Sequence, residues 1–283
     1  MKLTRSILDL GLQEPLRFLH ITDNHLAYAD ERDDSRKQEL ARSRSAAFEN
    51  TAGECEIFLD EAISYAQKNC DLLLHTGDLI DFVSHKNLEI VRQKLTGVDY
   101  FFATGNHEFS LYVGEAFEDL PYKMRSMDQV QSFFKNNLLF ASRIINGLNL
   151  VAIDNSYYHF SEQQLKQFMA EVSKGYPIVL LLHNPICTDD LFDKMMALHQ
   201  NKCAYLVGCT ENQLASFTPE RKRQQCPLPS TMAFIDYLKQ QPLVKAVIAG
   251  HLHLNHESML TGNIKQYVTG GGYEGVAREF VIS

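Results

Sequence analysis

The stretch LRFLHITDNH, residues 16–25, joins a short apolar run to two side chains that are common metal ligands. Residues 16–22 are mostly apolar, which is typical of a strand that is covered on both faces. Asp23 and His25 follow this run directly. In open α/β sheets, ligands bind beyond the carboxyl ends of the strands. The stretch therefore predicts an α/β fold with a functional site at that edge of its sheets.

Similar apolar runs recur along the chain, and helical patterns separate several of them. The further runs span residues 71–76, 100–104, 148–153, 178–182 and 246–249. Residues 54–69 and 161–173 carry apolar side chains at helical spacing, and Ser161 with Gln164 fits a capping box. Alternating strands and helices predict an α/β protein. Asn146-Gly147 predicts a hairpin turn, so the sheets should be mixed, with some antiparallel pairs.

The composition suits a folded protein with a substantial core. The chain has 283 residues, of which 45 % are hydrophobic and 22 % are charged, and its formal net charge is −8. An acidic surface argues against binding to long nucleic acids or to anionic membranes. No apolar run approaches the roughly 20 residues of a membrane span, and the start of the chain lacks the features of a signal peptide. Six scattered cysteines without a CxxC pair indicate reduced thiols, so we expect a cytoplasmic protein.

We expect residues 1–283 to form one domain. The length also permits two small domains, but the sequence has no clear linker and no internal repeat. A long segment at about 184–242 contains several prolines and predicts an insertion on the substrate side. The highly charged segment 28–50 predicts a solvated loop or an exposed helix.

Polar side chains follow the other apolar runs as they follow the first. They are Asp78 and Asp81 after 71–76, Asn106 and His107 after 100–104, His183 after 178–182, and His251 and His253 after 246–249. A glycine, which permits a tight turn, precedes three of these groups, at Gly77, Gly105 and Gly250. Because the runs should end at one edge of the sheets, we expect these side chains to lie close together.

These residues offer oxygen and imidazole ligands without a thiolate among them. The candidate metal ligands are Asp23, His25, Asp78, Asn106, His183, His251 and His253. Seven ligands exceed the needs of one tetrahedral zinc ion and suit two divalent ions that share a carboxylate. Paired ions of this kind stabilise both the attacking and the leaving oxygen in phosphoryl displacement.

The ordered motifs D-x-H, G-D-x-x-D, G-N-H-[ED], H and G-H-x-H closely resemble the signature of the calcineurin-like metallophosphoesterase superfamily. The resemblance extends over about residues 18–273. It implies a four-layer α/β/β/α sandwich, in which helices flank two mixed β-sheets. It also implies a cofactor of two divalent metal ions, which are manganese, iron or zinc in members of the family.

The resemblance further implies a role for each residue of the site. Asp23, His25 and His253 would bind one ion, Asn106, His183 and His251 would bind the other, and Asp78 would bridge both. A water or hydroxide shared by two such ions is a nucleophile at neutral pH and would attack phosphorus. His107 is the candidate proton donor to the leaving oxygen, and the resemblance implies that Asp81 orients its imidazole. An alternative for Asp81 is a carboxylate at the start of a helix.

We therefore expect a metal-dependent hydrolase of phosphodiester or phosphomonoester bonds. Its substrate would be a small phosphate ester, with nucleotides among the candidates, and the sequence leaves the oligomeric state open. Phe82-Val83 follows Asp81 where the protein serine/threonine phosphatases of the superfamily carry Arg-Gly, which argues against that substrate class. A noncatalytic protein-binding scaffold of the same fold is the alternative, and loss of ligands or of His107 would be its sign. A single-zinc amidohydrolase would not require the Gly-Asn-His motif.

Several other polar residues receive a structural interpretation. His20 and His75 lie inside apolar runs, and we expect both to be buried and hydrogen-bonded. We expect Tyr158 to pack rather than to line the site, and His199 to lie on the surface or in a loop. Glu108 matches the family motif, but its position indicates no clear direct role.

Overall fold

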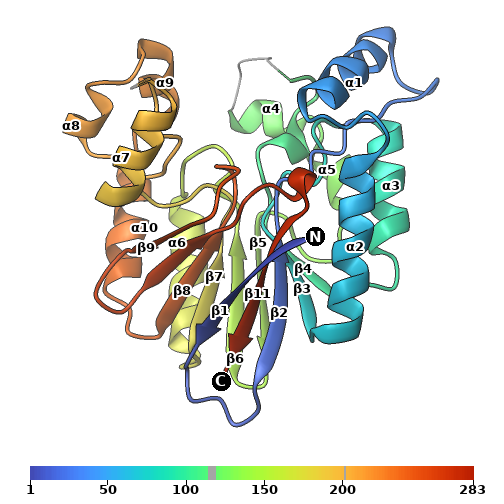
Figure 1. Cartoon of the computed structure of the whole chain (residues 1–283). Helices are drawn as coiled ribbons and strands as arrows, with labels where there is room; N and C mark the ends of the chain where they lie inside the picture. Colours follow the sequence, from blue (N-terminus) through green and yellow to red (C-terminus); the bar gives the residue numbers. More distant parts are fainter. Residues whose placement is uncertain (114–118, 201) are drawn as a thin grey trace.

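Two β-sheets stacked face to face form the centre of the computed structural model, which describes residues 1–113, 119–200 and 202–283 (Figure 1). Within these residues, the first sheet has five strands in the order β1-β11-β2-β3-β4, and the second has six in the order β5-β6-β7-β8-β10-β9. The first sheet consists of β1 (Lys2–Leu8), β11 (Val276–Ile282), β2 (Leu16–Ile21), β3 (Leu72–His75) and β4 (Tyr100–Phe102). The second consists of β5 (Phe140–Ile145), β6 (Leu148–Ile153), β7 (Ile178–Leu181), β8 (Val244–Ala249), β10 (Lys265–Val268) and β9 (His256–Met259).

Each sheet contains both parallel and antiparallel pairs. Strands β2, β3 and β4 are parallel, whereas β11 is antiparallel to β2. Strands β6, β7 and β8 are parallel, whereas β5 is antiparallel to β6. Asn146 and Gly147 join β5 to β6 with φ of 46° and 82°, the left-handed values that a tight hairpin turn requires. The predicted hairpin and the mixed sheets are confirmed.

Each strand at the centre of the fold is buried on both faces, because its side chains alternate between two cores. Phe18 and Leu74 of the first sheet pack between the sheets against Leu150 and Ile248 of the second. Leu19, the neighbour of Phe18, points instead to the outer core of the first sheet. This double burial explains why the strands appear in the sequence as nearly continuous apolar runs.

Helices cover the outer face of each sheet and complete the predicted α/β/β/α layers. Helices α2 (Glu54–Asn69) and α3 (His85–Leu95) cover the first sheet, and α6 (Glu162–Ser173) and α10 (Pro229–Lys239) cover the second. Phe168 of α6 and Phe234 of α10 pack together, with ring centroids 5.1 Å apart. The predicted capping box is present, since Ser161 and Gln164 exchange side-chain-to-backbone hydrogen bonds.

The remaining helices lie around one end of the sheets (Figure 1). They are α1 (Ser35–Ala47), α4 (Leu120–Met124), α5 (Met127–Gln131), α7 (Asp189–Leu198), α8 (Glu211–Leu214) and α9 (Pro219–Gln225). Helix α1 has no buried residue, as expected for the charged segment 28–50. The segment 184–242 contributes α7, α8 and α9 at this end and α10 beside α6, and its residue 201 lies outside the described residues.

Two further findings concern the chain as a whole. None of the six cysteines, all of which the structure describes, is in a disulfide. Among the described helices, none combines the length and the apolar character that crossing a bilayer demands.

Candidate active site

The polar residues that follow β2, β3, β4, β7 and β8 meet at one end of the two sheets. Five of them have a left-handed backbone, which is costly for any residue but glycine. They are Asp23 (φ 54°), His25 (φ 49°), Asp78 (φ 53°), His251 (φ 69°) and His253 (φ 52°). Strained residues persist where the surrounding structure fixes them, and they concentrate at functional sites. The strand ends thus turn sharply to direct these side chains inward.

Two glycines permit the loops to approach this closely. A Cβ atom on Gly105 would overlap the carboxylate of Asp78. A Cβ atom on Gly250 would overlap the hydroxyl of Thr22 and contact the carboxylate of Asp23. Close packing between loops therefore requires glycine at two of the three positions noted in the sequence, Gly105 and Gly250.

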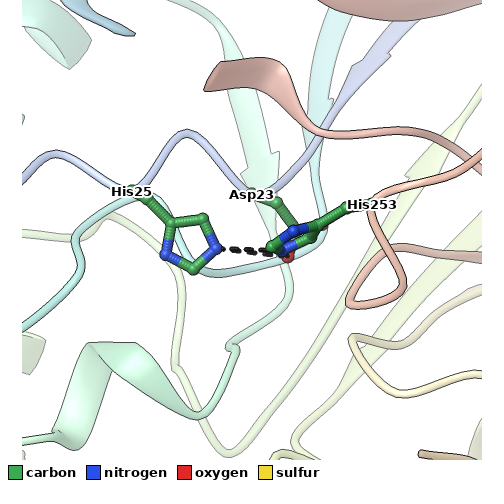
Figure 2. A group of neighbouring side chains, drawn as sticks. All are labelled: Asp23, His25 and His253. Atoms are coloured by element: carbon green, nitrogen blue, oxygen red, sulfur yellow. Dashed lines mark hydrogen bonds and ion pairs between the residues drawn. The ribbon is translucent and has the colours of Figure 1, made fainter. Parts of the chain in front are cut away.

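Asp23, His25 and His253 form a first group of candidate ligands, shown in Figure 2. The Nε2 atoms of His25 and His253 are 3.1 Å apart. The Oδ1 atom of Asp23 lies 3.4 Å from His253 Nε2 and 3.8 Å from His25 Nε2. This oxygen is buried and has no hydrogen-bond partner among the residues that the structure describes, although a buried carboxylate oxygen normally has one. The oxygen therefore faces the point where the two imidazoles converge.

Asp78, His183 and His251 form a second group beside the first. His183 Nε2 lies 3.2 Å from Asp78 Oδ2 and 3.1 Å from His251 Nδ1. Asp78 Oδ2 is also 3.9 Å from His25 Nε2, so one carboxylate oxygen lies between nitrogens of both groups. Asn106 follows β4, and its Oδ1 is a second buried oxygen without a partner. All seven ligands proposed from the sequence lie in the described part of the chain at this end of the sheets.

Hydrogen bonds on the outer side fix the orientation of three imidazoles. His183 Nδ1 lies 2.7 Å from the carbonyl oxygen of Thr76, and His25 Nδ1 lies 2.9 Å from Asp81 Oδ1. Because an acceptor holds each outer nitrogen as a donor, the inner nitrogen presents a lone pair to the cluster. His251 instead contacts the hydroxyl of Tyr158 through Nε2, at 2.8 Å. Tyr158 is buried, as expected of a packing residue, but it also contacts the site.

Asp81 connects several elements of the site. Its Oδ1 is 3.3 Å from His107 Nδ1, but the same nitrogen donates to the main-chain carbonyl of Asp81 at 2.6 Å. The carboxylate makes its shorter contacts with His25 and with Arg44. Asp81 therefore holds His107 mainly through its backbone and holds His25 through its side chain.

Glu108 has a structural role that its position in the sequence did not indicate. Its buried carboxylate accepts the backbone N–H groups of Asp78 at 2.9 Å, Leu79 at 2.7 Å and Gly105 at 2.7 Å. Burial, reinforced by the nearby charge of Asp78, raises the pKa of Glu108 to about 7. Glu108 ties the loop after β3 to the loop after β4.

The pKa values of the buried carboxyl and imidazole groups in the cluster depend on one another. Burial favours the neutral form of Asp23, but its contact with His253 holds the pKa of this carboxyl below its usual range. Burial likewise opposes ionisation of Asp78, and His183 and His107 lower the pKa of its carboxyl. Burial opposes protonation of His183, yet the charge of Asp78 raises the pKa of His183 to about 9. The ionised carboxylates of the cluster therefore favour a proton on the imidazole of His183.

Sequence reasoning missed four residues that support the site. Arg44 is in the last turn of α1, and Phe48 caps the same helix. The ring of Phe48 stacks on His25, with centroids 4.2 Å apart. Asn155 Oδ1 accepts the backbone N–H groups of His183 at 3.1 Å and of Asn184 at 3.0 Å, which fixes the loop after β7. Asn155 and Asn184 had a detectable signal, since both are polar residues directly beyond apolar strands.

Four of the seven candidate ligands, together with His107, line a pocket of about 240 Å³. The lining residues are His25, Arg44, Phe48, Asp78, His107, Met195, His199, Tyr205, His251, Leu252 and His253. His199 lies in the turn after α7, as expected of a loop residue, and it also lines this pocket together with Met195 of α7. A larger hollow of about 560 Å³ lies on the outer face of α2 and contains none of these residues. We therefore take the smaller pocket as the candidate active site, because it is the one of the two that candidate metal ligands and His107 line.

The sequence matches the family model of the calcineurin-like phosphoesterases over residues 16–255. The chain belongs to this family. The match confirms the resemblance found in the motifs, and the two mixed sheets with flanking helices confirm the fold that it implied. No curated protein sequence shows a significant match to this calcineurin-like phosphoesterase.

Solved structures share the fold of this calcineurin-like phosphoesterase at low sequence identity. A dimetal phosphatase from Danio rerio is 15 % identical with a TM-score of 0.52, and the alignment covers 92 % of this chain and 88 % of that one. A purple acid phosphatase from yellow lupin (Lupinus luteus) seeds is 14 % identical with a TM-score of 0.52, covering 93 % of this chain and 45 % of that one. A putative 5'-nucleotidase from Staphylococcus aureus is 12 % identical with a TM-score of 0.50, covering 92 % and 49 %. This chain therefore spans about half the length of the last two.

Proposed function

We propose that this calcineurin-like phosphoesterase hydrolyses small phosphate esters with the aid of two divalent metal ions. Asp23, His25 and His253 would hold one ion, and Asn106, His183 and His251 the other, with Asp78 shared. The observation that carries the proposal is the position of Asp78 Oδ2, which is 3.2 Å from His183 Nε2 and 3.9 Å from His25 Nε2. A carboxylate oxygen between two sets of imidazoles is suited to two cations.

The residues present fit such ions by two tests. Asp23 Oδ1 and Asn106 Oδ1 are buried oxygens without partners, and both belong to the proposed ligand set. The inner nitrogens of His25 and His253 are 3.1 Å apart, a separation that a shared cation would stabilise. Oxygen and imidazole ligands suit manganese, iron and zinc alike, so we propose the class of ion and not its identity. When bound, paired divalent ions activate water for attack on phosphorus and neutralise charge on the phosphoryl oxygens.

His107 would supply the proton that the leaving oxygen needs. Its Nδ1 donates to the carbonyl of Asp81 at 2.6 Å, which leaves Nε2 on the pocket side, 4.0 Å from Asp78 Oδ2. Burial opposes the charged imidazole, but the carboxylates of Asp78 and Asp81 outweigh it and raise the pKa of His107. A protonated Nε2 near neutral pH can donate to the leaving oxygen. Asp81 would act as the positioning residue for both His107 and His25.

The size of the pocket supports a small substrate. Its volume of about 240 Å³ is below the range of about 300–1,000 Å³ in which drug-sized ligands bind. Met195, His199 and Tyr205 line the pocket together with Arg44 and Phe48, and all three come from the segment 184–242. We propose that the chain is a single catalytic domain in which this segment forms part of the substrate wall.

The test is a substrate panel combined with metal analysis. The purified protein would be assayed with p-nitrophenyl phosphate and bis(p-nitrophenyl) phosphate, with added manganese and after treatment with a chelator. We expect turnover that chelation abolishes and metal restores, together with about two bound ions per chain. If the protein holds no divalent ions after incubation with manganese, the proposal is refuted. Bound metal without turnover of any ester would favour the noncatalytic scaffold.

A further inference from the structure

Arg44 reaches the site from α1, a helix whose residues are all half-buried or exposed. Helix α1 has no buried residue, and Arg44 lies in its last turn. The side chain of Arg44 is 25 % exposed, and it lines the pocket together with Asp78 and His107. Ser45, the next residue, anchors this end of the helix by donating to the carbonyl of Ala27 at 3.1 Å. The end of α1 is thus fixed so that one arginine points inward.

Two contacts hold the Arg44 guanidinium in a defined plane. Its Nε and Nη2 donate to the two carboxylate oxygens of Asp81, at 2.6 and 3.0 Å. The guanidinium carbon is 4.9 Å from the centre of the Phe48 ring. A planar fork held in this way loses little further entropy when its remaining donors bind an anion. The Nη1 group of Arg44 carries two such donors, and it has no partner among the described residues.

The charge of Arg44 has no equivalent in the pocket. Among the described residues that line it, Arg44 alone is a lysine or arginine. Neutralising Asp81 explains the fork, but it does not require the guanidinium to face the pocket beside His107. A fixed cation with free donors at that position is suited to binding an oxyanion.

We propose that Arg44 binds an unesterified phosphoryl oxygen of the substrate, and that it makes the site prefer phosphomonoesters to phosphodiesters. This inference rests on the proposed phosphoesterase function. A phosphomonoester has three unesterified oxygens and up to two negative charges, whereas a diester has two such oxygens and one charge. An added cation with free donors favours the monoester. Helix α1 then serves as the element that delivers this residue to the site.

The test compares Arg44→Met with a matched variant, Arg42→Met, because Arg42 is an exposed arginine on the same helix. Methionine keeps an apolar stem against Phe48 and removes the charge. For metal-loaded Arg44→Met, we expect kcat/KM to fall at least 10-fold on p-nitrophenyl phosphate and less than 3-fold on bis(p-nitrophenyl) phosphate. Arg44→Lys should recover part of the loss, and Arg42→Met should match the wild type. An equal loss on both esters, or no loss, overturns the proposal.

A binding measurement separates this inference from the proposed function. Calorimetry with inorganic phosphate on the metal-loaded protein needs no turnover, and metal content is measured in parallel. We expect phosphate to bind Arg44→Met at least 10-fold more weakly at unchanged metal content. Reduced metal content with unchanged phosphate affinity per loaded site would show that Arg44 only supports Asp81, and this overturns the inference. If the wild type hydrolyses neither ester, the proposed function fails, and weaker phosphate binding by Arg44→Met still supports Arg44 as an anion-binding residue.

Discussion

The imidazole of His25 lies flat against the ring of Phe48, with ring centroids 4.2 Å apart and the planes inclined by 14°. His25 follows β2, whereas Phe48 caps α1, so this contact joins a strand end to the exposed helix. The edge of the same imidazole is held by Asp81 through Nδ1. A candidate metal ligand is therefore oriented by an aromatic residue from one segment and a carboxylate from another.

Replacing Phe48 with leucine should disturb His25 without removing any charge. Stacked aromatic pairs contribute about 1 kcal/mol beyond their buried area, so we expect a loss of unfolding free energy of roughly this size. We also expect metal to bind several-fold more weakly, because His25 gains freedom to rotate. Chemical denaturation and metal titration check these two effects. Unchanged metal affinity would mean that Asp81 alone orients His25.

Asp78→Asn should abolish the response to metal. An amide cannot supply the negative charge that two ions would share, so metal content and esterase activity should fall together. For the wild type, a ligand at 100 times its Kd stabilises the folded state by about 2.7 kcal/mol, which a thermal melt with manganese would detect. Asp60→Asn changes an exposed carboxylate on α2 and is the matched control. A manganese-dependent shift in Tm that persists in Asp78→Asn would contradict the assignment.

His107→Ala should separate metal binding from proton donation. We expect metal content to stay unchanged, while kcat falls by about 100- to 10,000-fold on esters with poor leaving groups. Esters such as p-nitrophenyl phosphate should lose less, because their leaving oxygen needs little help from an acid. The measurement is a plot of log kcat against the pKa of the leaving group. A slope identical in both proteins would remove His107 from the proton-transfer step.

We expect Glu279 to make the free energy of unfolding depend on pH, independently of the candidate site. Its carboxylate accepts hydrogen bonds from Tyr65 at 2.8 Å and from Arg5 at 3.1 Å. Burial alone would favour the protonated form, but these contacts lower the pKa of Glu279 below its usual 4.5. The stabilisation is therefore present above about pH 4.5 and is lost as the pH falls through the lower pKa of the folded state. Glu279→Gln should flatten the pH dependence of unfolding free energy in this acidic window, and an unaltered slope would contradict the prediction.

The sequence predicted strands β2, β3, β4, β6, β7 and β8 and the polar residues that follow five of them, because both depend on short-range patterns, whereas β1, β9 and β11 were not predicted. Leu72–His75 is an apolar run, and Asp78 follows it within a few residues, so strand and site are read together. The capping box at Ser161 is likewise a local signal. Such features can be predicted from a single sequence, because the residues that form each of them are close together in the chain.

Arg44 and Phe48 were not predicted, because nothing local distinguishes them. Helix α1 contacts the site only near its end and has no buried residue, so no apolar stripe marks the inward side. Arg44 meets Asp81 across 37 positions of sequence, and that pairing exists only in the folded chain. The role of Glu108 was also hidden, since its partners are backbone N–H groups, which leave no trace in residue identity.

The position of β11 has a consequence for how the chain folds. This strand lies between β1 and β2, so Phe280 pairs with both Ser6 and Phe18. Until β11 has been made, β1 has no neighbour in the sheet and β2 has only β3. Contacts between residues so distant in sequence form slowly, because the entropy cost of closing a long loop comes before the contacts stabilise the fold. During synthesis, β2 would expose an unpaired edge, which is the kind of surface that chaperones shield from aggregation. His251 and His253 also contact Asp23 only after β8 has been made, so the candidate metal ligands come together only once residues 1–253 have been synthesised.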